Sequence, residues 1–375
     1  MSAHPTPPTL TDDPVDGRGV TIRGHLPGDA QGSFEQSQDP ASQAWTTVPV
    51  PYSMDDARLF VGEIMPRGWA FDSEWGFAVE YDGRYAGTVS LRNEGQGRGE
   101  IAYGSHPWVR GTGVMERALR LLLDWGFAQR DLQTVIWWAH RGNWASRRLA
   151  WRLGFSVEGT VRRWTPQRGE LIDSWVGTLL RDDPREPRST WLENPVVEGE
   201  GVRLRPFTDA DLPRLVGGLG DPDTQYWLAF MPRDPGETEA RQYLATVQER
   251  LATAHTITWA FSATDADELL GVVGLYQLVE GREAEVGYWT HPAARGRGLT
   301  TRATGLAIRH AFESLGLDRL SGHASVPNVA SRRILEAHGM HPTGVQRRAA
   351  RTGDGSLVDL AGYDLLAEEF ATSRR

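Results

Sequence analysis

The feature that most constrains the fold of this chain is an internal repeat with a fixed spacing. Residues of the first half recur in the second half 185 positions later. The matching pairs are Glu100 and Glu285, His106 and His291, Arg110 and Arg295, Asn143 and Asn328, Ser146 and Ser331, and Gly154 and Gly339. A spacing that holds without a gap over this whole stretch indicates a duplicated domain. The 375-residue chain is therefore expected to form two domains of similar size.

Each repeat predicts an α+β domain. Strand-like segments joined by a tight turn come first, at residues 75–81 and 85–91 in copy one, and a strand–turn–helix–strand–helix–strand portion follows. We place the first domain at residues 16–182, a proline-rich, charged linker at 183–197 and the second domain at 198–375. Residues 1–15, which are rich in proline and acids, are expected to form a disordered leader without a signal-peptide pattern.

Composition excludes several kinds of chemistry. The chain has no cysteine, which rules out disulfides, thiolate zinc sites and a cysteine nucleophile and fits a reducing cytoplasm. It has no lysine, so a Walker-type phosphate loop and a Schiff-base lysine are impossible. The net charge of −9 argues against a nucleic-acid partner, and no apolar run reaches the roughly 18 residues that span a membrane. No histidine pair has metal-ligand spacing, so no metal is expected.

A glycine-rich turn stands at the same place in both copies, between a strand-like segment and a helix-like one. The turns are residues 110–115, RGTGVM, and residues 295–300, RGRGLT. Glycines before a helix leave backbone N–H groups uncovered, which suits a phosphate group. The G-x-G-x-x-G pattern of dinucleotide sites is not met, because Glu116 and Thr301 stand where the third glycine would be. A purely structural tight turn remains an alternative.

Together with the downstream motif N-x-x-S-R-R and the L-G-F or H-G-M that follows it, these turns resemble those of the GNAT acyl-CoA transferases. The nearest branch includes the ribosomal-protein N-terminal acetyltransferases. The resemblance implies two tandem GNAT domains, each a mixed, mostly antiparallel central sheet with helices on both faces and a splayed strand pair. It also implies that CoA binds at the turns and between the splayed strands. The cofactor-binding residues would be Arg110, Gly111, Thr112, Gly113, Val114, Met115 and Asn143 in copy one, and Arg295, Gly296, Arg297, Gly298, Leu299, Thr300 and Asn328 in copy two.

The last residue of each turn departs from the family pattern, which has Gly or Ala there. Copy one has Met115, whose side chain could crowd the phosphate. Copy two has Thr300, which is smaller and whose hydroxyl can donate to a phosphate oxygen. Copy two is therefore expected to be the better-preserved donor site.

Acyl transfer to an amine needs a base, because an alkyl amine titrates near 10 and attacks only when it is unprotonated. Glu100 and Glu285 precede the turns on a strand, where the family often places a catalytic glutamate; a solvated acid at a strand start is the alternative. Ser146 and Ser331 match the position that offers the departing thiolate a hydrogen-bond donor in the related branch. A serine near a helix start is also ordinary capping chemistry.

Two further groups of residues bear on the acceptor. Asp173 and Asp359 lie on the last strand of each copy and are predicted to bind substrate by receiving a cationic amine. Tryptophans cluster around the expected cofactor region of copy one, where they form either core packing or an aromatic acceptor surface. They are Trp137, Trp138, Trp144 and Trp151.

We therefore expect an N-acyltransferase that moves an acyl group, most simply from acetyl-CoA, to a primary amine of a small molecule, a peptide or a protein N-terminus. The amine would attack the thioester directly in a ternary complex. One alternative is transfer of a longer acyl chain, from CoA or an acyl carrier protein, to a peptide or amino sugar. Another is a CoA-sensing or scaffold protein with one or both domains silent. The chain would be either a monomer with pseudo-dimeric halves or a homodimer.

Overall fold

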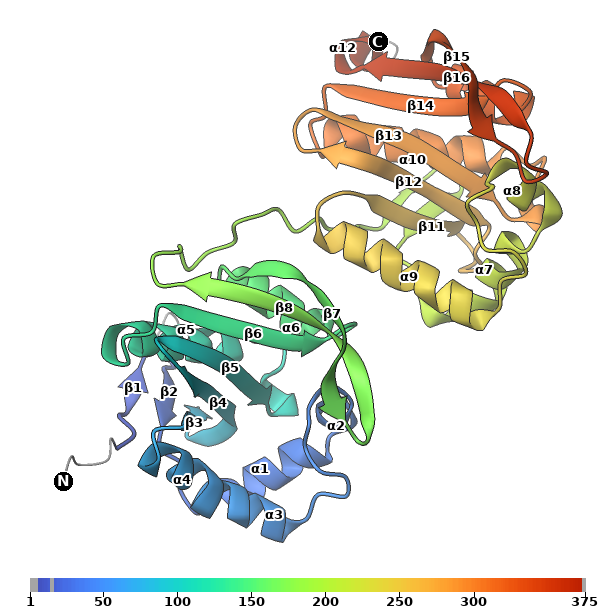
Figure 1. Cartoon of the computed structure of the whole chain (residues 1–375). Helices are drawn as coiled ribbons and strands as arrows, with labels where there is room; N and C mark the ends of the chain where they lie inside the picture. Colours follow the sequence, from blue (N-terminus) through green and yellow to red (C-terminus); the bar gives the residue numbers. More distant parts are fainter. Residues whose placement is uncertain (1–5, 14–16, 373–375) are drawn as a thin grey trace. The chain divides into compact units, whose positions relative to one another are not determined.

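The computed structural model describes residues 6–13 and 17–372, and the chain divides into two compact units, residues 1–188 and 189–375 (Figure 1). Whatever was predicted for residues 1–5, 14–16 and 373–375 lies outside the described residues. The two units share one architecture.

Unit 1 is built on an eight-stranded sheet with the strand order β1-β2-β3-β4-β5-β6-β8-β7. The strands are β1 (Leu10–Thr11), β2 (Val20–Arg23), β3 (Glu74–Tyr81), β4 (Arg84–Gly95), β5 (Arg98–Ser105), β6 (Thr134–His140), β7 (Ser156–Gln167) and β8 (Glu170–Leu180). The α-helices are α1 (Asp29–Gln38), α2 (Pro40–Trp45), α3 (Met54–Leu59), α4 (Met65–Ala70), α5 (Val114–Gln129) and α6 (Trp144–Arg152). The order places β5 and β6, which α5 connects, side by side within the sheet.

Unit 2 has a second eight-stranded sheet, in which β9 to β16 follow the same order. The strands are β9 (Val197–Gly199), β10 (Val202–Arg205), β11 (Ile257–Ala263), β12 (Gly271–Val279), β13 (Glu283–Thr290), β14 (Arg319–Ser325), β15 (His341–Arg351) and β16 (Leu357–Leu366). The α-helices are α7 (Leu212–Leu219), α8 (Pro222–Trp227), α9 (Glu237–Ala252), α10 (Leu299–Glu313), α11 (Val329–Ala337) and α12 (Ala367–Thr372). Here α10 connects β13 to β14.

One strand pair in each sheet is parallel, and that pair parts after a few residues. In unit 1, β5 pairs with β6 from Arg98 opposite Thr134 to Ile101 opposite Trp137. In unit 2, β13 pairs with β14 only over residues 283–285 and 319–321. The other strand pairs between described residues are antiparallel. The prediction of a mixed, mostly antiparallel sheet is confirmed.

Helices cover both faces of the sheet in unit 2. Side chains of a strand point alternately to the two faces. Ala284 and Val286 of β13 therefore join the core beneath α10, whereas Trp289 joins a smaller core with α7 and α9. Figure 1 shows α9 and α10 on opposite sides of the sheet. The predicted two-sided α+β fold is confirmed.

Hydrogen bonds connect the predicted leader and the predicted linker to the folded units. In the leader, β1 pairs with β2, and Asp12 Oδ1 accepts a hydrogen bond from Arg117 Nη2 at 2.9 Å. In the predicted linker, Pro195 O accepts a hydrogen bond from Trp259 Nε1 at 2.9 Å. The described part of the leader is thus ordered, contrary to the prediction. Composition alone does not show such contacts, because their partners lie far away in the sequence.

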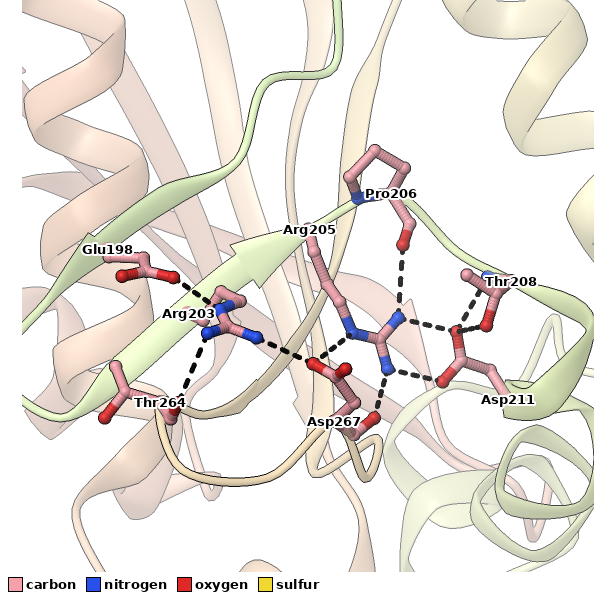
Figure 2. A network of polar contacts seen from close by, with 8 residues as sticks. All are labelled: Glu198, Arg203, Arg205, Pro206, Thr208, Asp211, Thr264 and Asp267. Atoms are coloured by element: carbon pink, nitrogen blue, oxygen red, sulfur yellow. Dashed lines mark hydrogen bonds and ion pairs between the residues drawn. The ribbon is translucent and has the colours of Figure 1, made fainter.

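A buried arginine–aspartate pair ties β10 to the segment before α7 (Figure 2). Arg205 Nη1 and Nη2 donate to the two carboxylate oxygens of Asp211 at 2.8 and 2.7 Å, and these side chains are 9% and 2% exposed. Arg205 Nη2 also donates to Asp267 O at 2.5 Å. Unit 1 has the same two-pronged pair between Arg23 and Asp29. The pair is therefore part of the duplicated framework.

Replacing Asp211 by alanine is expected to destabilise unit 2 by about 3–5 kcal/mol, because the buried Arg205 guanidinium loses the group that balances its charge. Calorimetric unfolding of the whole chain should show the unit 2 transition at a lower temperature and the unit 1 transition unchanged. Asp209→Ala removes an acid that is 86% exposed and is the matched control. A D211A transition equal to that of D209A would show that the pair adds no stability.

Candidate active site

The two glycine-rich turns have the same backbone geometry. Gly111 and Gly113 have φ of 77° and 83°, and Gly296 and Gly298 have φ of 71° and 68°. These left-handed values favour glycine, because a side chain there strains the backbone. Each turn runs into the start of a helix, α5 or α10, whose first N–H groups have no partner within the helix. The turns can therefore donate several main-chain hydrogen bonds to one anion.

The arginine that opens each turn is held by the aspartate that caps a short helix. Arg295 Nη2 bonds to Asp221, the N-cap of α8, and Arg295 Nη1 donates to Asp223 at 3.1 Å. In unit 1, Arg110 Nη2 donates at 2.6 Å to Asp39, the N-cap of α2. Burial by itself would raise the pKa of Asp221, but the hydrogen bond from Arg295 holds that pKa below its ordinary value. Both arginines thus fix the turns through protein partners, whereas the sequence assigned them to CoA.

The last residue of each turn is buried. Met115 is 8% exposed and belongs to the core of unit 1, so it does not crowd the anion site as the sequence suggested. Thr300 is 5% exposed, and its hydroxyl lies 2.5 Å from Thr290 Oγ1 on β13. The donors that face an anion are therefore the backbone amides, which every residue other than proline supplies. The last residue of the turn therefore does not distinguish the anion sites of the two copies.

Unit 2 contains a cavity of about 2150 Å³ that gathers most of the residues predicted for copy two. Those that line it are Arg295, Gly296, Gly298, Leu299, Thr300, Asn328, Ser331 and Glu285. Of the predicted residues of this copy, Arg297 and Asp359 do not line it. Aromatic and apolar side chains line it as well, among them Trp227, Leu228, Phe230, Met231, Tyr243 and Trp289. Ligand cavities are commonly about 300–1,000 Å³, so this one has room for two substrates.

Asn328 and Ser331 stand at the N-terminus of α11, where they meet β13. Asn328 Oδ1 accepts a hydrogen bond from Ser331 N at 3.1 Å and so caps the helix. Tyr288 OH donates to Ser331 O at 2.9 Å and lies 3.2 Å from Ser331 Oγ. Burial raises the pKa of Tyr288 to about 12, so this hydroxyl stays protonated at neutral pH. Capping takes only the oxygen of Asn328, which leaves its amide nitrogen as a donor toward the cavity.

In unit 1 a tryptophan joins the corresponding tyrosine and serine. Trp137 on β6 is 1% exposed, and its Nε1 donates to Tyr103 OH on β5 at 3.1 Å and to Ser146 Oγ at 3.2 Å. The indole thus links the two parallel strands where they part. The residue at the corresponding position of β14 is Gly322, and there the side chains of Leu335 and Met340 occupy the space beside the backbone. Asn143 caps α6 as Asn328 caps α11, so the helix start is retained in both units.

Two other tryptophans of the predicted cluster pack against rings of unit 1. Trp144 lies on Trp175, with ring centroids 4.6 Å apart, and Trp175 is 1% exposed. Trp138 stacks on Trp164 with a centroid distance of 5.3 Å, and Trp164 is 53% exposed. Trp144 thus takes part in core packing, whereas the Trp138–Trp164 stack lies at the surface.

The two glutamates predicted as bases have different partners. Glu100 accepts a hydrogen bond from Arg92 Nη1 at 2.6 Å, and a guanidinium stays charged at every relevant pH. Glu285 Oε1 lies 3.0 Å from Nδ1 of His323, whose imidazole can gain and lose a proton. His323 also lines the cavity. Sequence reasoning misses this residue, because only the parallel pairing of β13 with β14 brings it to Glu285.

Asp173 and Asp359 are engaged by the backbone of neighbouring strands. Asp173 Oδ1 accepts from Arg163 N, and Asp359 Oδ1 accepts from Arg348 N, both at 2.8 Å. Arg163 and Arg348 have φ of 49° and 53°, at irregular points in the pairing of β7 with β8 and of β15 with β16. Each aspartate therefore supports a strained residue in the sheet. Their role in binding an acceptor amine stays a prediction.

A mixed sheet whose parallel strands part beside a glycine-rich helix start, repeated in two units, defines the class of this protein. The sequence pattern of the Acetyltransferase (GNAT) domain matches residues 20–156 and 202–341, which are more than half of the chain. The chain therefore belongs to the GNAT acetyltransferase family and carries two GNAT domains, as the sequence motifs predicted.

Several proteins are similar to parts of this chain. "Probable N-acetyltransferase YjcK" of Bacillus subtilis is 32% identical over 110 residues, which are 29% of this chain and 61% of that protein. Spermidine N(1)-acetyltransferase of Escherichia coli is 36% identical over 91 residues, 24% of this chain and 49% of that enzyme. The solved structure of RimL, a ribosomal L7/L12 alpha-N-protein acetyltransferase, is 17% identical with a TM-score of 0.41, over 46% of this chain and 94% of that one. The matched part thus spans about half to three-fifths of the two curated relatives.

Among the residues that the structure describes, no helix is both long and apolar enough to cross a membrane. Within residues 6–13 and 17–372, no three histidine, aspartate or glutamate side chains gather in a way that could hold a metal ion.

Replacing Asp221 by asparagine is expected to weaken CoA binding about tenfold, or about 1.4 kcal/mol. Asparagine still caps α8 but lacks the charge that holds Arg295 and, through it, the turn. Asp223→Asn changes a partner of Arg295 that is 80% exposed and should leave the affinity within about twofold. Calorimetric titration of the whole chain measures the CoA affinity of both variants. Equal affinities for D221N and D223N would contradict the role of Asp221.

The contact between Asp221 and Arg295 also depends on pH. Because the pKa of Asp221 is lowered in the folded protein, the contact is intact at neutral pH and is lost only as the pH falls through that lowered value.

Proposed function

We propose that unit 2 is an N-acyltransferase that moves an acyl group from a CoA thioester, most simply acetyl-CoA, to a primary amine. The observation that carries the proposal is one cavity that brings Glu285 and Ser331 together with the turn at residues 295–300. Direct transfer from a thioester to an amine needs a base, a donor to the leaving thiolate and an anion site. Membership of the GNAT family supports an acyl-CoA donor.

Each group of residues in unit 2 has its own role in the transfer reaction. The turn amides and the positive end of α10 bind the pyrophosphate of the donor. Asn328 donates from Nδ2 to the pantetheine arm, which lies between β13 and β14. Glu285 receives the proton of the incoming amine, directly or through a neighbouring group. The amine nitrogen bonds to the thioester carbon, the C–S bond breaks, and Ser331 Oγ donates a hydrogen bond to the departing thiolate.

Unit 1 is catalytically silent in this proposal. The Trp137 indole N–H donates to the hydroxyl of Ser146, the residue that corresponds to Ser331 of unit 2. Glu100 is paired with Arg92, which does not give up its charge. These contacts support a tandem protein with one working site, rather than two equal ones.

The acceptor is a primary amine of a small molecule, a peptide or a protein N-terminus. The spermidine acetyltransferase among the relatives acts, by its name, on a small amine. A second candidate reaction is transfer of a longer acyl chain, from CoA or an acyl carrier protein, to a peptide or amino sugar. The volume of the cavity and its side chains Trp227, Leu228 and Met231 favour it. Comparing kcat/KM for acetyl-CoA with that for longer acyl-CoA esters separates the two.

Replacing Glu285 by glutamine is expected to lower kcat about 10²–10⁴-fold. The uncharged amide cannot take up a proton, and it cannot stabilise the positive charge of a neighbouring base that has taken one up. CoA affinity should stay the same, since the turn is untouched. Glu100→Gln makes the same change at the corresponding position of unit 1 and should leave kcat unchanged. A loss of turnover in E100Q with full activity in E285Q would reverse the assignment of the units.

Titration of the whole chain with CoA is expected to show one binding site per chain, because Trp137 and Tyr103 already engage the hydroxyl of Ser146 in unit 1. Isothermal calorimetry gives the stoichiometry directly. Trp137→Phe removes the indole N–H that bonds to Ser146 and should add weak binding at unit 1, while Trp164→Phe, at an exposed ring, should not. Two CoA-binding sites in the unmodified chain would contradict the proposal that unit 1 is catalytically silent. Binding at neither unit would remove the proposed function altogether.

A further inference from the structure

We infer that His323 Nε2 is the atom that takes the proton from the acceptor amine, and that Glu285 acts by holding the imidazole. This inference rests on the proposed function of unit 2 and deepens it, because it moves the base from a carboxylate to an imidazole. His323 was not among the residues expected from the sequence.

The sheet brings the two side chains together where its parallel strands part. Glu285 of β13 is opposite Ser321 of β14 in the last pair before the gap. His323 follows two residues later and therefore points to the same face of the sheet as Ser321. His323 Nδ1 lies 3.0 Å from Glu285 Oε1, and both residues line the cavity.

The contacts leave one basic nitrogen free. Glu285 Oε1 is engaged by His323, and its Oε2 lies 3.4 Å from Gln277 Nε2. A carboxylate at Nδ1 favours the tautomer with the proton on that atom, which leaves the lone pair on Nε2. Among the described residues Nε2 has no hydrogen-bond partner. The residue opposite on β16 is Gly362, which has no side chain to cover the ring.

Unit 1 shows the same positions without this arrangement. The residue that corresponds to His323 is Trp138, and the one that corresponds to Gln277 is Arg92, which holds Glu100 at 2.6 Å. A tryptophan has no basic nitrogen, and an arginine pairs with the carboxylate permanently. The carboxylate–imidazole pair therefore occurs in unit 2, at the cavity, and is missing from unit 1.

Other ionisable groups surround the pair, and they bear on its pH dependence. Glu283 and Asp364 lie on the neighbouring strands, and each bonds to Arg319 at 3.2 Å. Ionisable side chains that line the cavity together with the pair include Tyr276 of β12, Arg250 of α9 and His255 before β11. Burial raises the pKa of Tyr276 to about 12, so it stays neutral at the working pH.

The lone pair of the neutral amine forms a bond to the thioester carbon, and His323 Nε2 takes a proton from the amine nitrogen. The C–S bond breaks and its electron pair leaves on sulfur, which Ser331 Oγ stabilises by a hydrogen bond. The imidazolium, stabilised by Glu285, releases its proton to water, and the thiolate takes up a proton from water. The products are an amide and CoA.

The test is the pH profile of kcat/KM for His323→Asn in the whole chain. The unmodified protein should show an acidic limb, because protonation of the imidazole removes the lone pair that accepts the proton. H323N should lose this limb and about 10²–10⁴-fold in kcat, with its CoA affinity unchanged. Glu285→Gln should keep a limb of imidazole type at reduced kcat, shifted to lower pH because the charge beside the ring is gone.

His341→Asn is the matched control, because His341 also stands near a glutamate, Glu369, at 3.8 Å, but does not line the cavity. It should leave both kcat and the limb unchanged. His255→Asn should also keep the limb. A H323N protein with the kcat and the acidic limb of the unmodified chain would overturn the inference while leaving the acyltransferase in place. An unmodified chain that transfers acyl groups to no amine would instead overturn the proposed function.

Discussion

The structure of each unit depends on the point at which two parallel strands stop pairing. Once β13 and β14 part, the main-chain groups along their facing edges have lost their strand partners, and something must fill the space between them. In unit 1 an indole does so, with its N–H bonded across the gap to Tyr103 and Ser146. In unit 2 the corresponding residue is Gly322, Tyr288 reaches Ser331 without an indole beside it, and Tyr288 and Ser331 both line the large cavity. The same parting of strands thus meets different side chains in the two units.

A second constraint comes from the arginine at the start of each turn. Its partner is the N-cap of a short helix, so one aspartate orders both α8 and the turn that precedes α10. The same connection exists in unit 1 between Arg110 and Asp39. The turn geometry is therefore maintained by the fold itself and does not require a bound anion. For this reason the geometry of the turn alone does not indicate which unit is active.

Much of the fold could be predicted from the sequence, because the repeat, the turn glycines and the helix-capping asparagines are local signals. The α+β fold, its two copies and the GNAT family were all predictable in this way. The partners of side chains across strands were not. The contact of His323 with Glu285, the bridging role of Trp137 and the support that Asp173 gives to Arg163 N depend on strand register, which no single stretch of sequence contains. The burial of Met115 was missed for the same reason, since the helix direction decides where it points.

The aromatic side chains that line the cavity give the molecule an optical property. Eleven of its fifteen tryptophans lie in unit 1, whereas Trp227 and Trp289 are the ones among the cavity-lining residues of unit 2. A ligand that fills the cavity changes the surroundings of those two indoles and leaves the others in place. Ligand binding would then appear as a small change in the intrinsic tryptophan fluorescence, on top of a large signal that stays constant. Replacing Trp227 by phenylalanine would show how much of that change comes from Trp227.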